Sequence, residues 1–242
     1  MKWLEGRVVE NRHWTDALFS LRVEAPRLAF EAGQFVRIAL EAELARPFSF
    51  VNPPEDPVLE FYGIVVPEGP LSPRLAKLRA GDRLLVATNP AGFLVLREVP
   101  EAETLWLVST GTGIAPYLSI LRTAATWQRF RQVVLVHAVR HARELVYRQA
   151  IGEILAAHHA VFHYVTLVSR EDSPGSLAGR IPARMRDGGL EAAAGAALDE
   201  RSHVMLCGNP DMLRDAAAAL AERGLRKHRR RSPGHITVES FW

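Results

Sequence analysis

The stretch "STGTGIAPYLSI", residues 109–120, decides the fold of the second half of the chain. It follows "TLWLV" (104–108), a continuous apolar run typical of a buried parallel strand, and it leads into a helical pattern. A glycine-rich turn between strand and helix presents free backbone N–H groups and the positive end of a helix dipole, which favour a phosphate. Pro116 stands where the dinucleotide fingerprint G-x-G-x-x-G has its last glycine, so a tight turn without a ligand is an equally good interpretation of this stretch alone.

The rest of residues 99–242 repeats the alternation of strand and helix. Such a pattern predicts an α/β domain with a mostly parallel sheet. The further strand-like runs are "QVVLVHA" (132–138), "FHYVTLVS" (162–169) and "HVMLC" (203–207), and helical patterns lie around 116–127, 143–157 and 211–223.

Residues 1–98 have a different pattern, with short β-branched and apolar runs separated by Gly, Pro, Asn or Asp. These spacings predict an antiparallel barrel or sandwich. One helix is expected within it, because Leu71, Leu75 and Leu78 have helical spacing. The two domains are therefore expected at 1–98 and 99–242. The predicted strands of the first domain are "GRVVEN", "LFSLRVE", "QFVRIALE", "FSFVN", "VLEFYGIVV", "RLLVA" and "FLVLREV".

The composition is that of a globular protein, with 48% hydrophobic and 24% charged residues and a net charge of +3. Charged residues near the start exclude a secretory signal, and no apolar run is long enough for a membrane span. A single cysteine, Cys207, fits the reducing cytoplasm, where we expect a monomer. No Cys-His pattern predicts a metal site.

Three arginines follow predicted strands of the second domain: Arg140, Arg170 and Arg180. The acidic residue that would bind a ribose 2′-hydroxyl about 20 positions after the glycine-rich turn is missing. A guanidinium can bind a 2′-phosphate in bidentate fashion, so NADPH is favoured over NADH. Each arginine taken singly is best explained as a solvated surface residue, and it is the three together at one edge of the predicted sheet that favour a phosphate site.

Two further stretches could hold ligands. In "MLCGNPDML", Cys207 ends a strand as a core residue or a ligand contact, and Asp211 is expected to cap the next helix. In "RPFSFVNPP", Phe48 and Phe50 share one strand face while Ser49 takes the other. A second anion site is expected at the start of the helix near Leu71.

Taken in order, the motifs R-x-F-S, G-x-L-S, G-T-G-I-A-P, S-R-E, G-R-I-P, C-G-N-P and a terminal aromatic residue resemble the ferredoxin/flavodoxin–NADP+ reductases of the bacterial type. The resemblance covers essentially the whole chain. It implies an FAD-binding β-barrel followed by an NADP(H)-binding α/β domain. The implied reaction is hydride exchange between NADP(H) and FAD, with single electrons passed to ferredoxin or flavodoxin.

The resemblance also implies roles for single residues. Ser49, Cys207 and Trp242 would act at the reacting rings, with Trp242 stacked on the flavin face opposite Phe48. Phe48 replaces the usual tyrosine, and Pro47 removes a backbone donor. The remaining implied contacts are Arg46, Leu71, Ser72 and Thr112 to FAD, Arg140, Ser169, Arg170 and Arg180 to the adenosine 2′-phosphate, and Gly208 and Asn209 to nicotinamide.

The basic run "RGLRKHRRR", Arg223–Arg231, holds six Lys or Arg residues and no acidic residue. It is either a solvated helix end or a docking site for an acidic ferredoxin or flavodoxin. A reductase of the same superfamily with free flavin or another acceptor is the alternative function. A nucleic-acid-binding module is the remote alternative, which we do not expect because no such motif accompanies the run.

Overall fold

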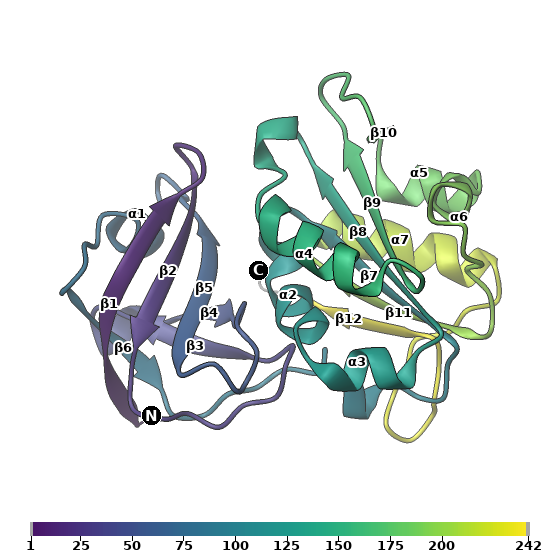
Figure 1. Ribbon diagram of the computed structural model, residues 1–242. Coiled ribbons are helices and arrows are strands. Elements are labelled where there is room, and N and C mark those ends of the chain that lie inside the picture. The colour runs from purple at the N-terminus through teal and green to yellow at the C-terminus, as the bar shows by residue number, and fades with distance from the viewer. Residues whose placement is uncertain (1, 241–242) are drawn as a thin grey trace. The chain divides into compact units, whose positions relative to one another are not determined.

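The computed structural model describes residues 2–240, which form two compact units (Figure 1). The first unit holds the chain up to Val95 together with Ala115–Arg122, and the second holds Leu96–Ile114 and the chain from Thr123 onward. The sequence-based boundary was drawn between residues 98 and 99. Residues 115–122 belong to the second domain expected from the sequence, 99–242, but in the structure they pack with the first unit.

The first unit is built on six antiparallel strands, β1 (Trp3–His13), β2 (Leu18–Glu24), β3 (Phe35–Ala39), β4 (Arg46–Ser49), β5 (Val58–Ile64) and β6 (Arg83–Ala87). Their order in the sheet is β4-β3-β6-β1-β2-β5. A bridge between Phe50 and Phe61 joins the two ends, and Val51 N donates to the Glu60 carbonyl oxygen at 2.9 Å. The sheet therefore nearly closes into the predicted barrel.

Helix α1 (Ser72–Leu75) covers one part of the barrel core, with Leu75 fully buried. The predicted helical stripe from Leu71 to Leu78 forms only one α-helical turn. The reason lies in β1, where Asn11 Nδ2 donates to the carbonyl oxygens of Leu75, Ala76 and Leu78 at 3.3, 3.0 and 2.8 Å. These bonds satisfy the carbonyl groups at the helix end, so the chain can leave the helix there.

The second unit is built on six parallel strands, β7 (Thr104–Thr110), β8 (Gln132–Val139), β9 (Phe162–Val168), β10 (Leu177–Ala178), β11 (Ser202–Cys207) and β12 (Ile236–Glu239). Their order is β10-β9-β8-β7-β11-β12. The four central strands are those predicted as apolar runs. The short edge strands β10 and β12 were not predicted, and the strand predicted at 93–99 is wrong, because the 3-10 turn η2 (Leu96–Glu98) forms within it.

Helices cover both faces of the parallel sheet (Figure 1). α5 (Ile181–Arg186), α6 (Gly189–Ala194) and α7 (Pro210–Glu222) pack on one face around a shared core, and α3 (Ala124–Arg129) and α4 (Arg148–His158) lie on the other. The 3-10 turn η3 (Gly111–Ile114) follows β7, and the 3-10 turn η4 (Ala142–Glu144) lies between β8 and α4.

The helix predicted at 116–127 is two helices, α2 (Ala115–Leu121) and α3. Arg122 Nη1 donates to the Val51 carbonyl oxygen at 3.2 Å and lies 3.4 Å from Glu60 Oε2, and Thr123 is extended. The helix predicted at 143–157 begins later because Tyr147 has a left-handed backbone with φ 59°.

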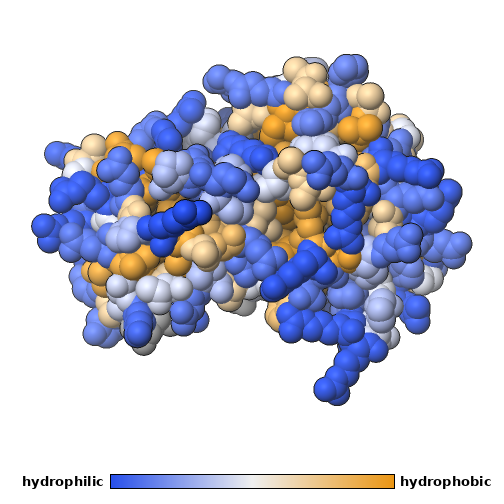
Figure 2. All heavy atoms as spheres, turned by 60° about the horizontal axis from the view of Figure 1, so that its bottom comes forward, coloured by the Kyte–Doolittle hydropathy of each residue, from blue (hydrophilic) through white to orange (hydrophobic). Residues whose placement is uncertain are grey.

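Hydrophilic side chains cover most of the face drawn in Figure 2, with hydrophobic areas between them. Among residues 2–240, no helix combines the length and the apolar composition needed to cross a bilayer.

Two buried histidines give this fold a predictable acid sensitivity. Burial lowers the pKa of His203 to about 3 and that of His137 to about 4. His203 Nε2 lies 2.9 Å from Thr237 Oγ1, and His137 Nδ1 lies 3.3 Å from the Tyr164 hydroxyl. Both imidazoles are therefore neutral in the folded protein near neutral pH.

We predict that the free energy of unfolding falls as the pH is lowered from about 7 to about 5. The folded pKa values lie below the unfolded value of about 6.5, so the unfolded chain binds more protons in this window. Each histidine should contribute a loss of about 1–2 kcal/mol. Urea titrations at both pH values should show a smaller loss for His203→Gln, and an unchanged pH dependence in that variant would contradict the assignment.

Candidate functional site

The ends of β7 and β11 interlock at the carboxyl edge of the parallel sheet. A Cβ atom on Gly113 would lie 2.6 Å from the Cys207 carbonyl oxygen, and one on Gly208 would lie 2.2 Å from Thr110 Oγ1. Gly208 also has φ +134°, a conformation that only glycine adopts without strain. The glycine-rich turn at 111–114 and the turn after β11 can therefore meet only where both lack side chains.

Asn209 fixes the second of these turns. Its backbone N–H donates to Thr110 Oγ1 at 2.9 Å, and its side-chain oxygen accepts from the N–H groups of Asp211 and Met212 at 2.9 and 3.2 Å. The prediction that Asp211 caps this helix is wrong, because Asn209 is the capping residue of α7. Asp211 instead pairs with Arg214 at 2.7 Å in the first turn.

Cys207 is completely buried at the end of β11, directly before the interlocked turn. Burial, with a further contribution from the negative charge of Glu239, raises the pKa of its thiol well above the ordinary value. The thiol is therefore protonated at neutral pH and is a poor nucleophile. Its side chain can shape the floor under the turn without reacting.

Three of the predicted anion-binding arginines lie at the exits of neighbouring strands. Arg140 follows β8, Arg170 follows β9 by two residues, and Arg180 follows β10 by two residues and begins α5. The backbone N–H of Arg170 donates to the Arg140 carbonyl oxygen at 3.0 Å, and Ser169 Oγ donates to the Val139 carbonyl oxygen at 3.3 Å. The fold therefore brings Arg140, Ser169 and Arg170 together, with Arg180 on the adjacent strand exit.

The carboxylates near these exits are bonded to backbone groups. Glu144 Oε2 accepts from the N–H groups of Arg140 and His141 at 2.9 and 3.1 Å, and Glu171 Oε1 accepts from Ala142 N at 2.6 Å. The bond from Ala142, followed by the bond from His141, holds the pKa of Glu171 below its usual range. In the part of the chain that the structure describes, the exposed guanidinium groups that follow β8, β9 and β10 pair with no carboxylate, whereas those of Arg186, Arg223 and Arg230 do.

In the first unit, the predicted residues Arg46, Pro47, Phe48 and Ser49 make up β4. Arg46 is exposed and donates to the Ala45 carbonyl oxygen at 3.0 Å. Pro47 is tolerated because β4 is a strand at one end of the sheet order, where a missing N–H leaves no central ladder bond unmade.

Phe48 is seated over a glycine that the sequence analysis did not single out. A Cβ atom on Gly63 would lie 2.8 Å from Phe48 Cε1, and the Phe48 ring packs edge-on against Phe61 with centroids 6.5 Å apart. Next to it, Ser49 Oγ is buried and has no hydrogen-bond partner within residues 2–240. A buried hydroxyl of this kind usually has a partner, so a bound polar group fits here.

Leu71 and Ser72, predicted as backbone contacts, begin α1. Ser72 Oγ accepts from Val66 N at 2.9 Å. Arg74 binds Glu41 through two bonds of 2.6 and 2.7 Å, which ties α1 to the loop before β4. Only the structure could show the Glu41–Arg74 pair, since its members are 33 residues apart in sequence.

Two predicted residues remain, Thr112 and Trp242, and the structure describes only the first of them. Thr112 is half-buried within the glycine-rich turn, on the second unit. Trp242 lies outside the described residues. Thr110 and Gly63 were not predicted as site residues, although a glycine within a strand pattern was an available signal for Gly63.

Known proteins resemble this chain over its whole length. It is 50% identical over 245 residues to the flavodoxin/ferredoxin–NADP reductase of Escherichia coli (strain K12), with 99% of each chain covered. It is 39% identical to a ferredoxin–NADP reductase of Pseudomonas aeruginosa, covering 96% of this chain and 95% of the other. Residues 107–218 match the oxidoreductase NAD-binding domain family.

A solved structure extends the likeness to three dimensions. The ferredoxin NADP+ reductase from Neisseria gonorrhoeae, crystallised with bound FAD and NADP, is 33% identical and superimposes with a TM-score of 0.93 over 100% of both chains. Both the barrel and the parallel-sheet unit are part of this agreement.

We predict that Gly113→Ala destabilises the second unit by about 1–3 kcal/mol, because the new methyl group would overlap the Cys207 carbonyl oxygen. Gly152→Ala is the matched control, since its methyl group would meet nothing within 4 Å in α4. That control should gain up to about 1 kcal/mol from helix propensity. Urea unfolding measures both, and equal stabilities for the two variants would show that the turns do not interlock.

Proposed function

The chain belongs to the flavodoxin/ferredoxin–NADP reductase family, and from this premise we propose which of its residues hold the two nucleotides. The protein is an FAD-dependent oxidoreductase that exchanges electrons between NADP(H) and ferredoxin or flavodoxin. When bound, FAD supplies a hydride acceptor that can also pass electrons one at a time. The protein itself binds, orients and shields the nucleotides.

We propose that the first unit, within the sequence domain 1–98, binds FAD. The buried Ser49 hydroxyl supports this because it has no partner among the described residues and can donate to a ring nitrogen or oxygen. Phe48, rigidly seated over Gly63, offers its open face to an aromatic ring. The further proposed contacts are Arg46 to the pyrophosphate, the backbone groups of Pro47, Leu71 and Ser72, and Thr112 near the flavin.

We propose that the second unit, within the sequence domain 99–242, binds NADP(H). Gly208 and Asn209 would border the nicotinamide, because their turn is packed against Thr110 and leaves Asn209 exposed at the carboxyl edge of the sheet. Cys207 would form the floor of this pocket as a neutral thiol. Ser169 would add a hydroxyl donor beside the arginines that follow β8, β9 and β10.

The specificity proposal rests on one observation, the three unpaired guanidinium groups at adjacent strand exits. A dianionic 2′-phosphate would supply the negative charge that the carboxylates of this edge, bonded to backbone N–H groups, do not. A ribose with a free 2′-hydroxyl would leave these charges uncompensated. NADPH should therefore be strongly preferred to NADH.

We predict that Arg170→Ala raises the KM for NADPH about tenfold or more while the KM for NADH changes little, because the lost bond serves only the 2′-phosphate. Steady-state reduction of ferricyanide by each nucleotide measures this. Arg143→Ala is the matched control, as Arg143 is a basic residue of the neighbouring loop that the proposal does not use. An equal loss with both nucleotides would contradict the proposed role, and a protein without FAD would contradict the function itself.

Two proposals rest on sequence alone. Trp242, outside the described residues, is proposed to cover the flavin and to give way to nicotinamide. We further propose that the protein works as a monomer in the cytoplasm. NADPH is available there, and the single buried cysteine stays reduced.

We propose that an acidic ferredoxin or flavodoxin docks on the basic run Arg223–Arg231. Two of its residues are engaged within the unit, since Arg223 binds Glu191 at 2.7 Å and Arg230 binds Glu98 at 2.8 Å. The run precedes β12 and therefore lies at the amino edge of the parallel sheet, opposite the strand exits that follow β8 and β9. A partner there would not compete with NADP(H). The basic residues left for it are Arg226, Lys227, Arg229 and Arg231.

We predict that Arg229→Glu/Arg231→Glu slows electron transfer to flavodoxin about tenfold at low ionic strength, with a smaller effect in salt. Arg230 is left unchanged so that its pair with Glu98 survives. Lys2→Glu/Arg27→Glu carries the same charge change elsewhere and is the control. NADPH–ferricyanide activity should stay constant, and equal slowing in the control would contradict docking at this run.

A further inference from the structure

Among residues 2–240, strand β12 leaves one edge of the parallel sheet open. Its inner side pairs with β11, from Val204 opposite Ile236 to Cys207 opposite Glu239. On its outer side, Ile236 N donates to the Arg226 carbonyl oxygen at 3.1 Å, and the Ile236 carbonyl oxygen accepts from His228 N at 2.7 Å. Of the residues that the structure describes, only Lys227 therefore pairs with the outer side of β12, through a single parallel bridge to Ile236, and the chain then turns away.

The outward N–H and C=O groups of Val238, two residues further along β12, are not covered in this way. Because N–H and C=O groups of residues two apart point to the same side of a strand, those of Val238 face outward as those of Ile236 do. In the portion of the chain from residue 2 to 240, neither Val238 group has a hydrogen-bond partner. An open strand edge is a template for a further strand.

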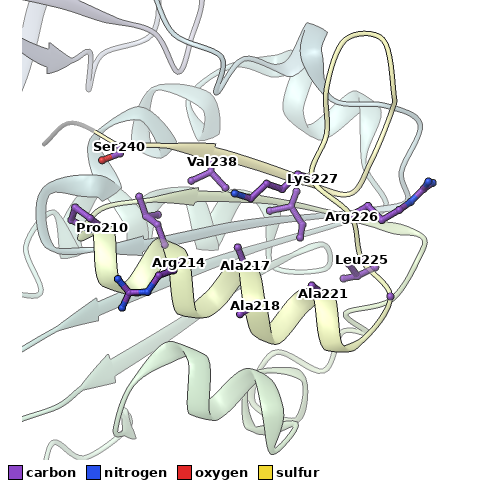
Figure 3. Close-up of a pocket in the computed structure, with 13 residues that line it drawn as sticks. Pro210, Arg214, Ala217, Ala218, Ala221, Leu225, Arg226, Lys227, Val238 and Ser240 are labelled. Carbon is purple, nitrogen blue, oxygen red and sulfur yellow. The ribbon is translucent and has the colours of Figure 1, made fainter.

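A groove of about 760 Å³ runs along this edge, between β12 and α7 (Figure 3). Its walls are apolar and low, because α7 presents alanine side chains towards it and β12 presents Ile236 and Val238. Small side chains let another backbone approach closely. The lining comprises Pro210, Leu213, Arg214, Ala217, Ala218, Ala221, Gly224, Leu225, Arg226, Lys227, Ile236, Val238 and Ser240.

The charge on the rim of this groove selects the kind of segment that fits it. Arg214 is neutralised by Asp211 at 2.7 Å and by Asp215 at 3.1 Å. Arg226 and Lys227, at the other end, have no ion pair among the described residues (Figure 3). The uncompensated charge on the rim is therefore positive, so acidic residues should accompany the apolar side chains of an occupant.

A second copy of this chain is a poorer occupant. Two copies would carry the same exposed positive charges, those of Arg226, Lys227 and Arg229, so that pairing their β12 edges would gain no attraction between opposite charges. The carboxylates of an acidic segment of another protein would instead be attracted to these positive charges.

We propose that the groove between β12 and α7 binds an extended, acidic and apolar segment of a partner protein, which adds to β12 as an outer strand. Its backbone bonds the N–H and C=O groups of Val238, its apolar side chains lie against the alanine face of α7, and its carboxylates meet Arg226 and Lys227. This is strand addition, in which the main chain gives affinity and the flanking groups give selectivity.

A short fluorescein-labelled peptide that alternates glutamate and valine tests this with the full-length protein. Fluorescence anisotropy should show saturable binding that weakens in salt, and the lysine–valine counterpart should bind at least about tenfold more weakly. Ala221→Glu, which places a negative charge in the groove, should weaken peptide binding about tenfold. Ala156→Glu is the matched control, another exposed alanine in the last turn of a helix.

Hydrogen exchange on the bound protein tests the strand addition itself. The amide of Val238 should exchange at least about tenfold more slowly with the acidic peptide present. NADPH–ferricyanide activity should be unchanged in both alanine variants, which separates this proposal from the nucleotide sites. No binding, equal binding of the two peptides, an unaffected Val238 amide, or a dimer that Ala221→Glu dissociates would each overturn the proposal.

Discussion

The architecture of the second unit depends on one steric constraint, the close approach of two turns at the carboxyl ends of β7 and β11. The turn after β11 passes Thr110 so closely that Gly208 can carry no side chain, and Gly113 lies against the Cys207 carbonyl oxygen under the same restriction. Asn209 then fixes the result through a backbone bond to Thr110 and a cap on α7. The turn that we assign to nicotinamide is thus preorganised by packing, which keeps the ordering cost of binding low.

Ion pairing divides the arginines of this unit into a structural and an available set. Arg186, Arg223 and Arg230 form ion pairs with glutamates. These pairs connect helices to one another and to the segment around Glu98. The guanidinium groups after β8 and β9 have no ion pair within residues 2–240, and the nearby carboxylates accept from backbone N–H groups instead. Free positive charge therefore gathers at both edges of the parallel sheet. We assign the carboxyl edge to a nucleotide phosphate and the amino edge to acidic proteins.

Sequence patterns predicted both sheets, since apolar runs and their spacing report burial directly. They failed where distant residues decide the outcome. The helix after Leu71 is short because Asn11, more than sixty positions earlier, binds its last carbonyl groups. The helix after the glycine-rich turn breaks where Arg122 binds the Val51 carbonyl oxygen. For the site, motif order named the arginines and Ser49, and only coordinates could reveal which charges are paired and that Gly63 seats Phe48.

The most direct test of this account is a crystal structure of the protein with FAD and NADP+ bound. The account predicts the 2′-phosphate within hydrogen-bonding distance of the guanidinium groups of Arg140, Arg170 and Arg180, and the Ser49 hydroxyl bonded to the flavin. A 2′-phosphate held by other residues, with these three side chains in solvent, would contradict the central claim that unpaired arginines at adjacent strand exits select NADP(H).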